Sequence, residues 1–457
     1  MYSSVPAPLA APPHQARALG GNEKAFWRLN ESGSLNCAVL AHLGPGSTLV
    51  PERVRAALAA LQARHPLLRA HIEVRAGQPW FVWPQAVPVL TLETRSVARD
   101  VWKHVIENEL RRVIPWTQAP LGRALLLEHG SEGATMALFF HHSIADGKAV
   151  IAALRDVLWH AVTGSAQSTV VHQRSLPSES ALPTRSRGVF GGLRRLRLVA
   201  GLAADGLRER ERDPVKVPVK QVAAPHERTY HVEPRGFDAK LSAALAARAR
   251  SVGSTVHGAI GAAMLFGVAR AAGVRSERVV TFGSPINVRE RLSPPMGEQM
   301  GLYLGASHFR GTIAPGTRFW TLARAIRERI AEDVDSGRAV DALPLIHLFY
   351  QSLGGDKATA IDFGRKWAEA NGTTGLTNLG RIDVEPPPGL TIERVRCLGF
   401  PSGLDVFNAL ASSYAGSLML DFNWPEPCFD RASALALVDD IVGTLRAAVH
   451  GEPSFAS

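Results

Sequence analysis

The chain has 457 residues, of which 46% are hydrophobic, 20% charged and 7% aromatic. This composition excludes a disordered or fibrous protein, and the length predicts two or three domains. The net charge of +10 predicts an acidic partner, which leaves nucleic acid, an anionic membrane surface, a phosphorylated cofactor and an acidic protein as alternatives.

Cysteine and apolar patterns narrow the class of protein further. The three cysteines are far apart and form no CxxC pair, which excludes a zinc ribbon and a disulfide framework (Cys37, Cys397 and Cys428). The first twenty residues have no basic residue before Arg17 and no sustained apolar stretch, unlike a signal peptide. The longest apolar stretch, 256–269, is short and contains His257. We therefore expect no transmembrane helix and a location in a reducing cytoplasm.

The N-terminal half predicts alternating helices and strands. A helix should begin at Pro51, which suits a first helical position, and end at His65, because Pro66 disfavours the α conformation in the residue before it. Apolar residues recur along this helix at helical spacing. Beyond it we expect a helix over 100–113 and strands over 67–74, 121–128 and 135–140.

The strand over 135–140 leads into the string HHSIADG, residues 141–147, which is the sharpest signal in the sequence. At the end of a buried strand, a loop side chain can point into a cleft while the sheet fixes its position. A neutral imidazole with a pKa near ~6.5 suits a general base at cytoplasmic pH, so His141 and His142 are candidates. Asp146 stands at the N-cap of a following helix, and Gly147 leaves room for another group to approach.

The same residues also have structural interpretations. A buried histidine is usually a hydrogen-bonded core residue, and Asp-Gly is usually a turn and a cap. The complete string weakens that interpretation, because its chance occurrence is on the order of one chain in a thousand. Two histidines and an aspartate are also possible metal ligands, but adjacent residues of an extended segment point to opposite faces. We therefore expect no metal site.

A basic stretch separates the two halves of the chain. From Arg185 to Lys220 there are ten Lys or Arg and four Asp or Glu, a local net charge of +6. Because Pro and Ser flank it, this stretch is predicted to connect two lobes. The expected organisation is an N-terminal lobe over 1–184, a basic linker or crossover over 185–225, and a C-terminal lobe over 226–457.

The second half repeats the alternation. Helices are expected over 238–250, 255–271, 317–333 and 432–450, and strands over 279–287 and 418–423. Mixed elements in both halves predict an α/β or α+β fold arranged as two lobes.

The string HHxxxDG resembles the signature of the thioester-dependent acyltransferases. This superfamily includes chloramphenicol acetyltransferase, plant acyltransferases, the condensation domains of nonribosomal peptide synthetases and the polyketide-associated acyltransferases. Three further segments resemble it in the same order along the chain. Residues 58–70 resemble the RHPxLR stretch of condensation domains and 284–289 their PVNLR segment, whereas 375–380 resemble the SNLG segment of the polyketide-associated and alcohol acyltransferases.

The resemblance implies two chloramphenicol-acetyltransferase-like lobes in a V-shaped pseudo-dimer, with a tunnel between them and the histidine motif at its centre. It implies that His142 is the general base and that Asp146 turns away from the substrate to pair with Arg289. The alternative is that Arg289 lies on a charged surface. Among the remaining candidates, Ser143, Thr377 and Asn378 would line the substrate tunnel.

The implied reaction moves an acyl group from a CoA or acyl-carrier-protein thioester to an acceptor hydroxyl, so that acyl-CoA or a phosphopantetheinyl thioester is a co-substrate. No bound cofactor is expected, and the lack of a GxSxG elbow argues against an acyl-enzyme. The tetrahedral oxyanion needs hydrogen-bond donors. Asn378 and the backbone N–H groups of Ser143 and Gly147 are the alternatives.

Two other functions remain open: a free-standing condensation domain that forms an amide or ester between carrier-bound substrates, and a non-catalytic member that recruits other proteins. The expected acceptor is a small-molecule or lipid alcohol, and an acyl carrier protein would act in trans. We expect a monomer that does not bind nucleic acid, because no helix-turn-helix, zinc or RNP motif accompanies the charge.

The basic stretch is the expected docking element. Residues 193–207 alternate apolar residues with arginines, so Arg194, Arg195 and Arg197 could bind a lipid surface, an acidic carrier protein or the phosphates of CoA. A solvated crossover without a partner explains the pattern equally well.

Overall fold

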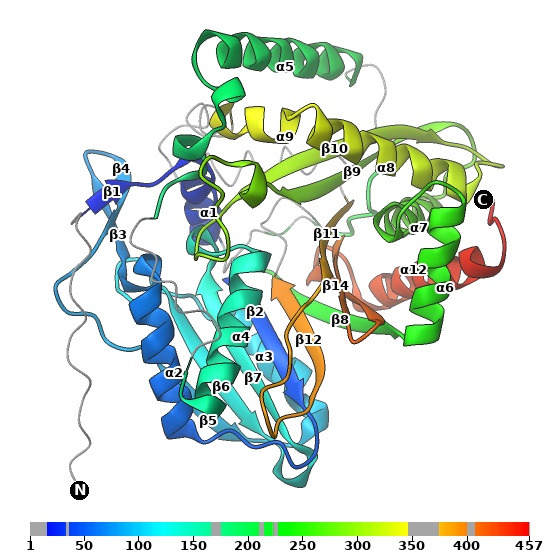
Figure 1. The fold of residues 1–457 in the computed structure, drawn as a ribbon. Coiled ribbons are helices and arrows are strands. Elements are labelled where there is room, and N and C mark those ends of the chain that lie inside the picture. The colour runs from blue at the N-terminus through cyan, green and yellow to red at the C-terminus, as the bar shows by residue number, and fades with distance from the viewer. Residues whose placement is uncertain are drawn as a thin grey trace, which may run out of the picture.

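The computed structural model describes residues 16–32, 36–165, 175–209, 214–221, 223, 227–345, 374–399 and 407–456. Within them the chain forms a mixed α/β fold built on two large sheets, each covered by helices (Figure 1). The predicted fold class is therefore confirmed. The tunnel between the lobes stays a prediction.

The N-terminal sheet has five strands in the order β12-β2-β7-β6-β5. Its neighbours pair antiparallel except β5 and β6, which run parallel. The strands span β2 (Asn36–Leu43), β5 (Leu92–Ser96), β6 (Gly122–Glu128), β7 (Ala134–His141) and β12 (Ile392–Gly399).

Helices cover both faces of this sheet. Residues of β2 alternate between the two, since Val39 and Ala41 join the core beneath α2 (Pro51–Arg64) and α4 (Gly147–Thr163). Ala38 and Leu40 instead join the core beneath α3 (Trp102–Arg111). A sheet buried on both faces explains the continuous apolar sequence of β7.

The C-terminal sheet has six strands in the order β10-β9-β11-β13-β14-β8, and β11 runs parallel to both of its neighbours. The strands span β8 (Thr229–Phe237), β9 (Arg278–Asn287), β10 (Leu304–Ile313), β11 (Thr374–Arg381), β13 (Phe407–Tyr414) and β14 (Ser417–Glu426). Four helices pack with it: α6 (Ala239–Ser251), α7 (Val256–Ala271), α8 (Phe319–Asp335) and α12 (Arg431–His450).

Smaller elements complete the described chain. A three-stranded sheet has the order β1-β4-β3, formed by β1 (Ala16–Ala18), β4 (Gln78–Val82) and β3 (His71–Arg75). The remaining helices are α1 (Gly21–Ser32), α5 (Gly188–Glu209) and the short α9 (Arg338–Asp341). The segment predicted as a linker thus contains a helix of 22 residues.

Strand β12 ties the two halves together. It lies in the segment predicted as the C-terminal lobe, yet it pairs along its length with β2 at the edge of the N-terminal sheet. Strand β8 of the C-terminal sheet also contacts the N-terminal half. Its Val232 N–H donates to Glu107 Oε1 of α3 at 2.8 Å. The lobes therefore share secondary structure as well as a packed surface.

Most predicted elements lie within a few residues of the observed ones, but the strand over 67–74 is wrong in its first half. Residues Pro66–Arg69 form a 3-10 turn, and the strand begins only at His71. Side chains from elsewhere hold the turn: Trp83 Nε1 donates to the Pro66 carbonyl at 2.8 Å, and Gln62 Nε2 donates to the Leu68 carbonyl at 3.2 Å.

Among the described residues, no single helix is long and apolar enough to span a membrane, although the bent pair α6 and α7 satisfies that test by length and composition. Every residue of α7 from Gly258 to Ala269 is buried inside the C-terminal lobe. All three cysteines are buried as free thiols.

Candidate active site

The histidine motif lies where β7 ends. The His141 N–H still donates to the Leu121 carbonyl at 3.1 Å, and its partner across the sheet is Asn36 of β2. One 3-10 turn (His142–Ile144) follows, and α4 begins at Gly147. The sheet and the helix therefore fix both ends of a short segment.

His141 is fully buried and faces its own turn. Its Nδ1 accepts from the Ser143 backbone N–H at 3.2 Å and lies 2.7 Å from Ser143 Oγ. Burial lowers the pKa of His141 to about 3, and the neighbouring His142 acts in the same direction. A ring that stays neutral and is hydrogen-bonded within the turn orients this segment.

His142 differs from its neighbour in exposure. Its ring is partly buried and lies 4.5 Å, between centroids, from the ring of Phe26 on α1. Nδ1 is buried without a hydrogen bond in the described chain, which leaves Nε2 as the accessible ring nitrogen. Burial lowers the pKa of His142, opposed by its own backbone, the Asp146 carboxylate and the Ala145 backbone.

Asp146 is the N-cap of α4, and its carboxylate accepts four hydrogen bonds. Oδ1 accepts from the Ala149 N–H at 3.0 Å and from an Arg289 terminal nitrogen at 2.8 Å. Oδ2 accepts from Arg289 Nε at 3.1 Å and from the Tyr303 N–H at 3.0 Å. With its lone pairs filled, this carboxylate caps a helix and anchors an arginine.

Arg289 is the other half of a buried ion pair, in which each side chain is 2% exposed. Besides its two bonds to Asp146, its guanidinium donates to the carbonyls of Gly297, Gln299 and Gly301 at 2.8–3.0 Å. These bonds use all five donors of the guanidinium. The structure thus brings together the predicted pair, and Arg289 is not a surface residue.

The loop over 297–303 is a meeting point for segments far apart in the sequence. The Met300 N–H donates to His65 Nδ1 at 3.2 Å, just after α2, and Glu298 accepts from Arg155 of α4 at 2.7 Å. Three of the four segments that carry the sequence resemblance, 58–70, 141–147 and 284–289, therefore contact this one loop.

The fourth segment reaches the motif through Gly147. A Cβ atom at Gly147 would lie 2.1 Å from Leu379 Cδ2 of β11, so only glycine admits Leu379 in its present position. Thr377 and Asn378 precede Leu379 on the same strand and are both half-buried. This strand end therefore lies against the start of α4, beside the histidines.

The three alternative oxyanion donors are not equivalent in the structure. The Ser143 N–H is already donated to His141. The side-chain oxygen of Asn378 accepts from the Gly380 N–H at 2.9 Å, which leaves its amide nitrogen as the donor. The Gly147 N–H, at the N-terminus of α4, makes no hydrogen bond within the described chain.

Sequence comparison finds one family and no curated relative. Residues 227–418 match the family described as phthiocerol/phthiodiolone dimycocerosyl transferase C-terminus. No curated protein sequence matches the chain.

Solved structures match almost the whole chain. Polyketide synthase associated protein 5 from Mycobacterium tuberculosis is 18% identical with a TM-score of 0.64, over 98% of this chain and 100% of that one. Trichothecene 15-O-acetyltransferase from Fusarium sporotrichioides is 14% identical with a TM-score of 0.75, over 98% and 100%. The first condensation domain of the calcium-dependent antibiotic synthetase is 16% identical with a TM-score of 0.68, over 97% and 98%. The chain therefore shares the fold of these acetyltransferase and condensation-domain structures.

Two residues near the histidine motif carried no signal in the sequence. Phe26 lies in a helix that no pattern predicted, and Tyr303 follows a loop without a motif. Leu379 lies in the segment 375–380 that carries the resemblance, but no pattern predicted its contact with Gly147. Tyr303 also places its ring 4.8 Å from the Arg289 guanidinium carbon. Only the fold brings these side chains to residues 141–147.

Proposed function

We propose that the chain is an acyltransferase that moves an acyl group from a CoA or carrier-protein thioester to an acceptor hydroxyl, with His142 as the general base. One observation carries the proposal. Asp146 is saturated by four hydrogen bonds, whereas Nε2 of His142 is accessible and makes no hydrogen bond in the described chain. His142 is therefore the motif's group that is free to accept a proton.

The lowered pKa of His142 suits this role. A ring that is neutral at pH 7 has a lone pair to offer. We place its single proton on the buried Nδ1, because the nearby backbone of His142 and Ala145 favours a protonated ring nitrogen. Nε2 then presents the lone pair. His141, hydrogen-bonded within the turn, would position the segment without touching substrate.

The reaction then follows in two steps. His142 Nε2 takes the proton of the acceptor hydroxyl as its oxygen attacks the thioester carbonyl carbon, which gives a tetrahedral oxyanion. The carbon–sulfur bond breaks as the carbonyl re-forms, and the proton passes from His142 to the leaving thiolate. The Gly147 N–H at the positive end of α4 and the Asn378 amide are the proposed oxyanion donors.

The comparisons support an acyltransferase and an oxygen acceptor. The matched family is described as a transferase, and the trichothecene enzyme is an O-acetyltransferase. The condensation-domain likeness supports the fold alone, so amide formation remains the alternative product.

The test is a substitution of His142. His142→Ala should lower the rate of thiol release from acyl-CoA or acyl-carrier donors by ~10²–10⁴-fold, because a positioned general base contributes that much. His104→Ala, the same change at an exposed histidine of α3, is the matched control and should leave the rate unchanged. Mass spectrometry of alcohol and amine acceptors identifies the product.

Each result bears on one alternative. Unchanged turnover in His142→Ala would refute the general base. A wild-type chain that uses no thioester in the presence of all acceptors would favour the non-catalytic, recruiting alternative. Acylated amine without acylated alcohol would replace ester formation by amide formation.

A further inference from the structure

Helix α5 lies outermost on one side of the molecule, beyond α9 (Figure 1). It follows a 3-10 turn (Thr184–Ser186) and packs against that turn and against α9. Little of the helix is buried: among its described side chains, over 188–201, only Gly191 is buried.

Two of the three arginines predicted to dock a partner point toward the body of the protein instead. Arg194 Nε donates to Asp341 of α9 at 2.7 Å, and the same side chain also donates to the Ser336 carbonyl. Arg195 donates to the Ser186 carbonyl at 2.9 Å. Arg194 thus tethers α5 to the C-terminal lobe, and Arg195 tethers it to the turn that precedes the helix. Both side chains are therefore engaged within the protein.

The outward face of α5 is apolar. Half of the ten large apolar side chains that the described chain exposes lie on this helix. They recur at helical spacing over its described side chains, at exposures of 45–80% (Val189, Phe190, Leu193, Leu196 and Val199). Together they expose on the order of 500 Å², the size of a functional patch on a monomer.

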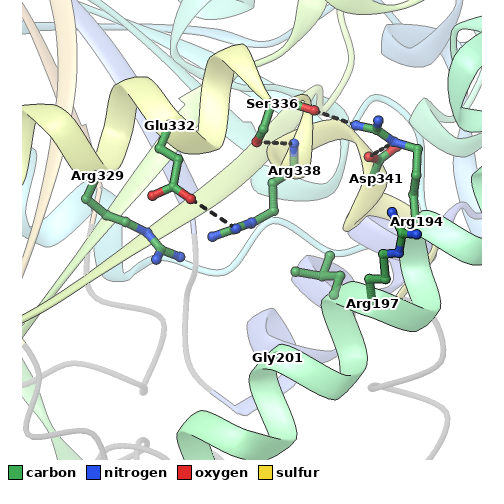
Figure 2. Close-up of a pocket in the computed structure, with 9 residues that line it drawn as sticks. Arg194, Arg197, Gly201, Arg329, Glu332, Ser336, Arg338 and Asp341 are labelled. Atoms are coloured by element: carbon green, nitrogen blue, oxygen red, sulfur yellow. Dashed lines mark hydrogen bonds and ion pairs between the residues drawn. The ribbon is translucent and has the colours of Figure 1, made fainter.

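A positive groove borders this face. It lies between α5 and the α8–α9 corner, has a volume of about 510 Å³, and is lined by four arginines against two acids (Figure 2). Arg329 and Arg338 there also bind Asp333. Arg197 is different: it is exposed beside the apolar face and makes no ion pair within the described chain.

We propose that α5 is a peripheral membrane-docking helix for an anionic lipid surface. The apolar face enters the region between headgroups and acyl chains, and Arg197 beside it meets lipid phosphates. Arg194 and Arg195 hold the helix against the rest of the protein. All of its outer apolar side chains can therefore contact the bilayer at the same time.

Other occupants fit the surface less well. A stable dimer needs about 800 Å² from each partner, more than this face offers. An acidic carrier protein would need exposed cations, but two of the three arginines are turned inward, and what they leave exposed is mainly Phe, Leu and Val. An apolar face beside one arginine that makes no ion pair within the described chain matches a lipid interface.

The test is vesicle flotation of the full chain with phosphatidylcholine vesicles, with and without phosphatidylglycerol. The wild-type chain should bind, and more strongly when phosphatidylglycerol is present. Phe190→Ser with Leu196→Ser should lower the partition coefficient at least ~10-fold, because both side chains leave the acyl-chain region. The control is Val50→Ser with Val113→Ser, which changes valines that are 50% and 57% exposed elsewhere on the chain. This variant should leave the partition coefficient unchanged.

A second variant tests the electrostatic part. Arg197→Gln should lower binding to phosphatidylglycerol vesicles ~5-fold and leave binding to phosphatidylcholine unchanged. The proposal is overturned if the wild-type chain binds no vesicle, or if Phe190→Ser with Leu196→Ser binds like wild type. A dimer in light scattering that this double variant dissociates, without vesicle binding, would assign the face to a second copy. Vesicle binding needs no thioester, so its failure leaves the proposed acyl transfer untouched.

Discussion

Two regions of the molecule each contain an Arg–Asp ion pair, and the two pairs have different roles. At the histidine motif, Arg289 and Asp146 are each 2% exposed, and every donor of the guanidinium is used. Beneath α5, Arg194 is 38% exposed although its partner Asp341 is only 5% exposed. Burial decides the difference: the first pair joins two lobes into one geometry, whereas the second attaches a single helix whose outer face stays open.

The largest effect is expected when the buried pair of Arg289 and Asp146 is broken. Arg289→Ala leaves the buried Asp146 carboxylate without its countercharge and three carbonyls without their arginine donors, so the free energy of unfolding should fall by about 3–5 kcal/mol. Arg194→Ala, the matched change in the other region, should cost no more than about 1 kcal/mol, because water reaches that pair. Urea denaturation of both variants measures the two losses. Equal losses would show that burial does not distinguish the two ion pairs.

A smaller effect is expected where β11 meets α4. Gly147→Ala places a methyl group on Leu379 and should cost about 1–3 kcal/mol through overpacking. Leu379→Ala in the same chain removes the obstacle, so the added methyl should then cost almost nothing. The coupling energy from this double-mutant cycle, measured by denaturation, should be clearly non-zero. Additive losses would show that the close approach at Gly147 is unimportant.

The smallest effect concerns Phe26, whose ring packs against the ring of His142. Because burial lowers the pKa of His142, the acid limb of kcat/KM should have its midpoint below pH 6.5: protonation removes the base only as pH falls through that lowered pKa. Phe26→Ala admits water to the ring, and the midpoint should rise toward 6.5 because the neutral form is then less favoured. Phe26→Leu keeps an apolar cover and should not move it. A wild-type midpoint above 6.5 would be inconsistent with a desolvated base.

Local rules accounted for much of the fold. Pro51 and Pro66 bracket α2 correctly, and the apolar run before residue 141 is a buried strand. The turn at Pro66–Arg69 escaped those rules, because the groups that satisfy its carbonyls, Trp83 and Gln62, lie elsewhere in the sequence. The pairing of β12 with β2 escaped them too, since strands so far apart leave no local trace.

The candidate site shows the same division. Asp146 as an N-cap follows from a short motif, and its pairing with Arg289 followed from the resemblance alone. The sequence could not assign Arg194 and Arg195, because a charge pattern does not say which face of a helix turns inward. Nor could it show that Leu379, rather than Asn378, is the residue of β11 that presses on Gly147.

The pairing of β12 with β2 has a consequence for synthesis on the ribosome. Until Ile392–Gly399 emerges, β2 pairs only with β7, and its other edge is the open edge of an otherwise complete N-terminal sheet. Such an edge invites pairing with other nascent chains. The edge of the N-terminal sheet therefore stays exposed through most of translation. Fragments of the chain that end before β12 should aggregate unless a chaperone or an added β12 peptide covers this edge.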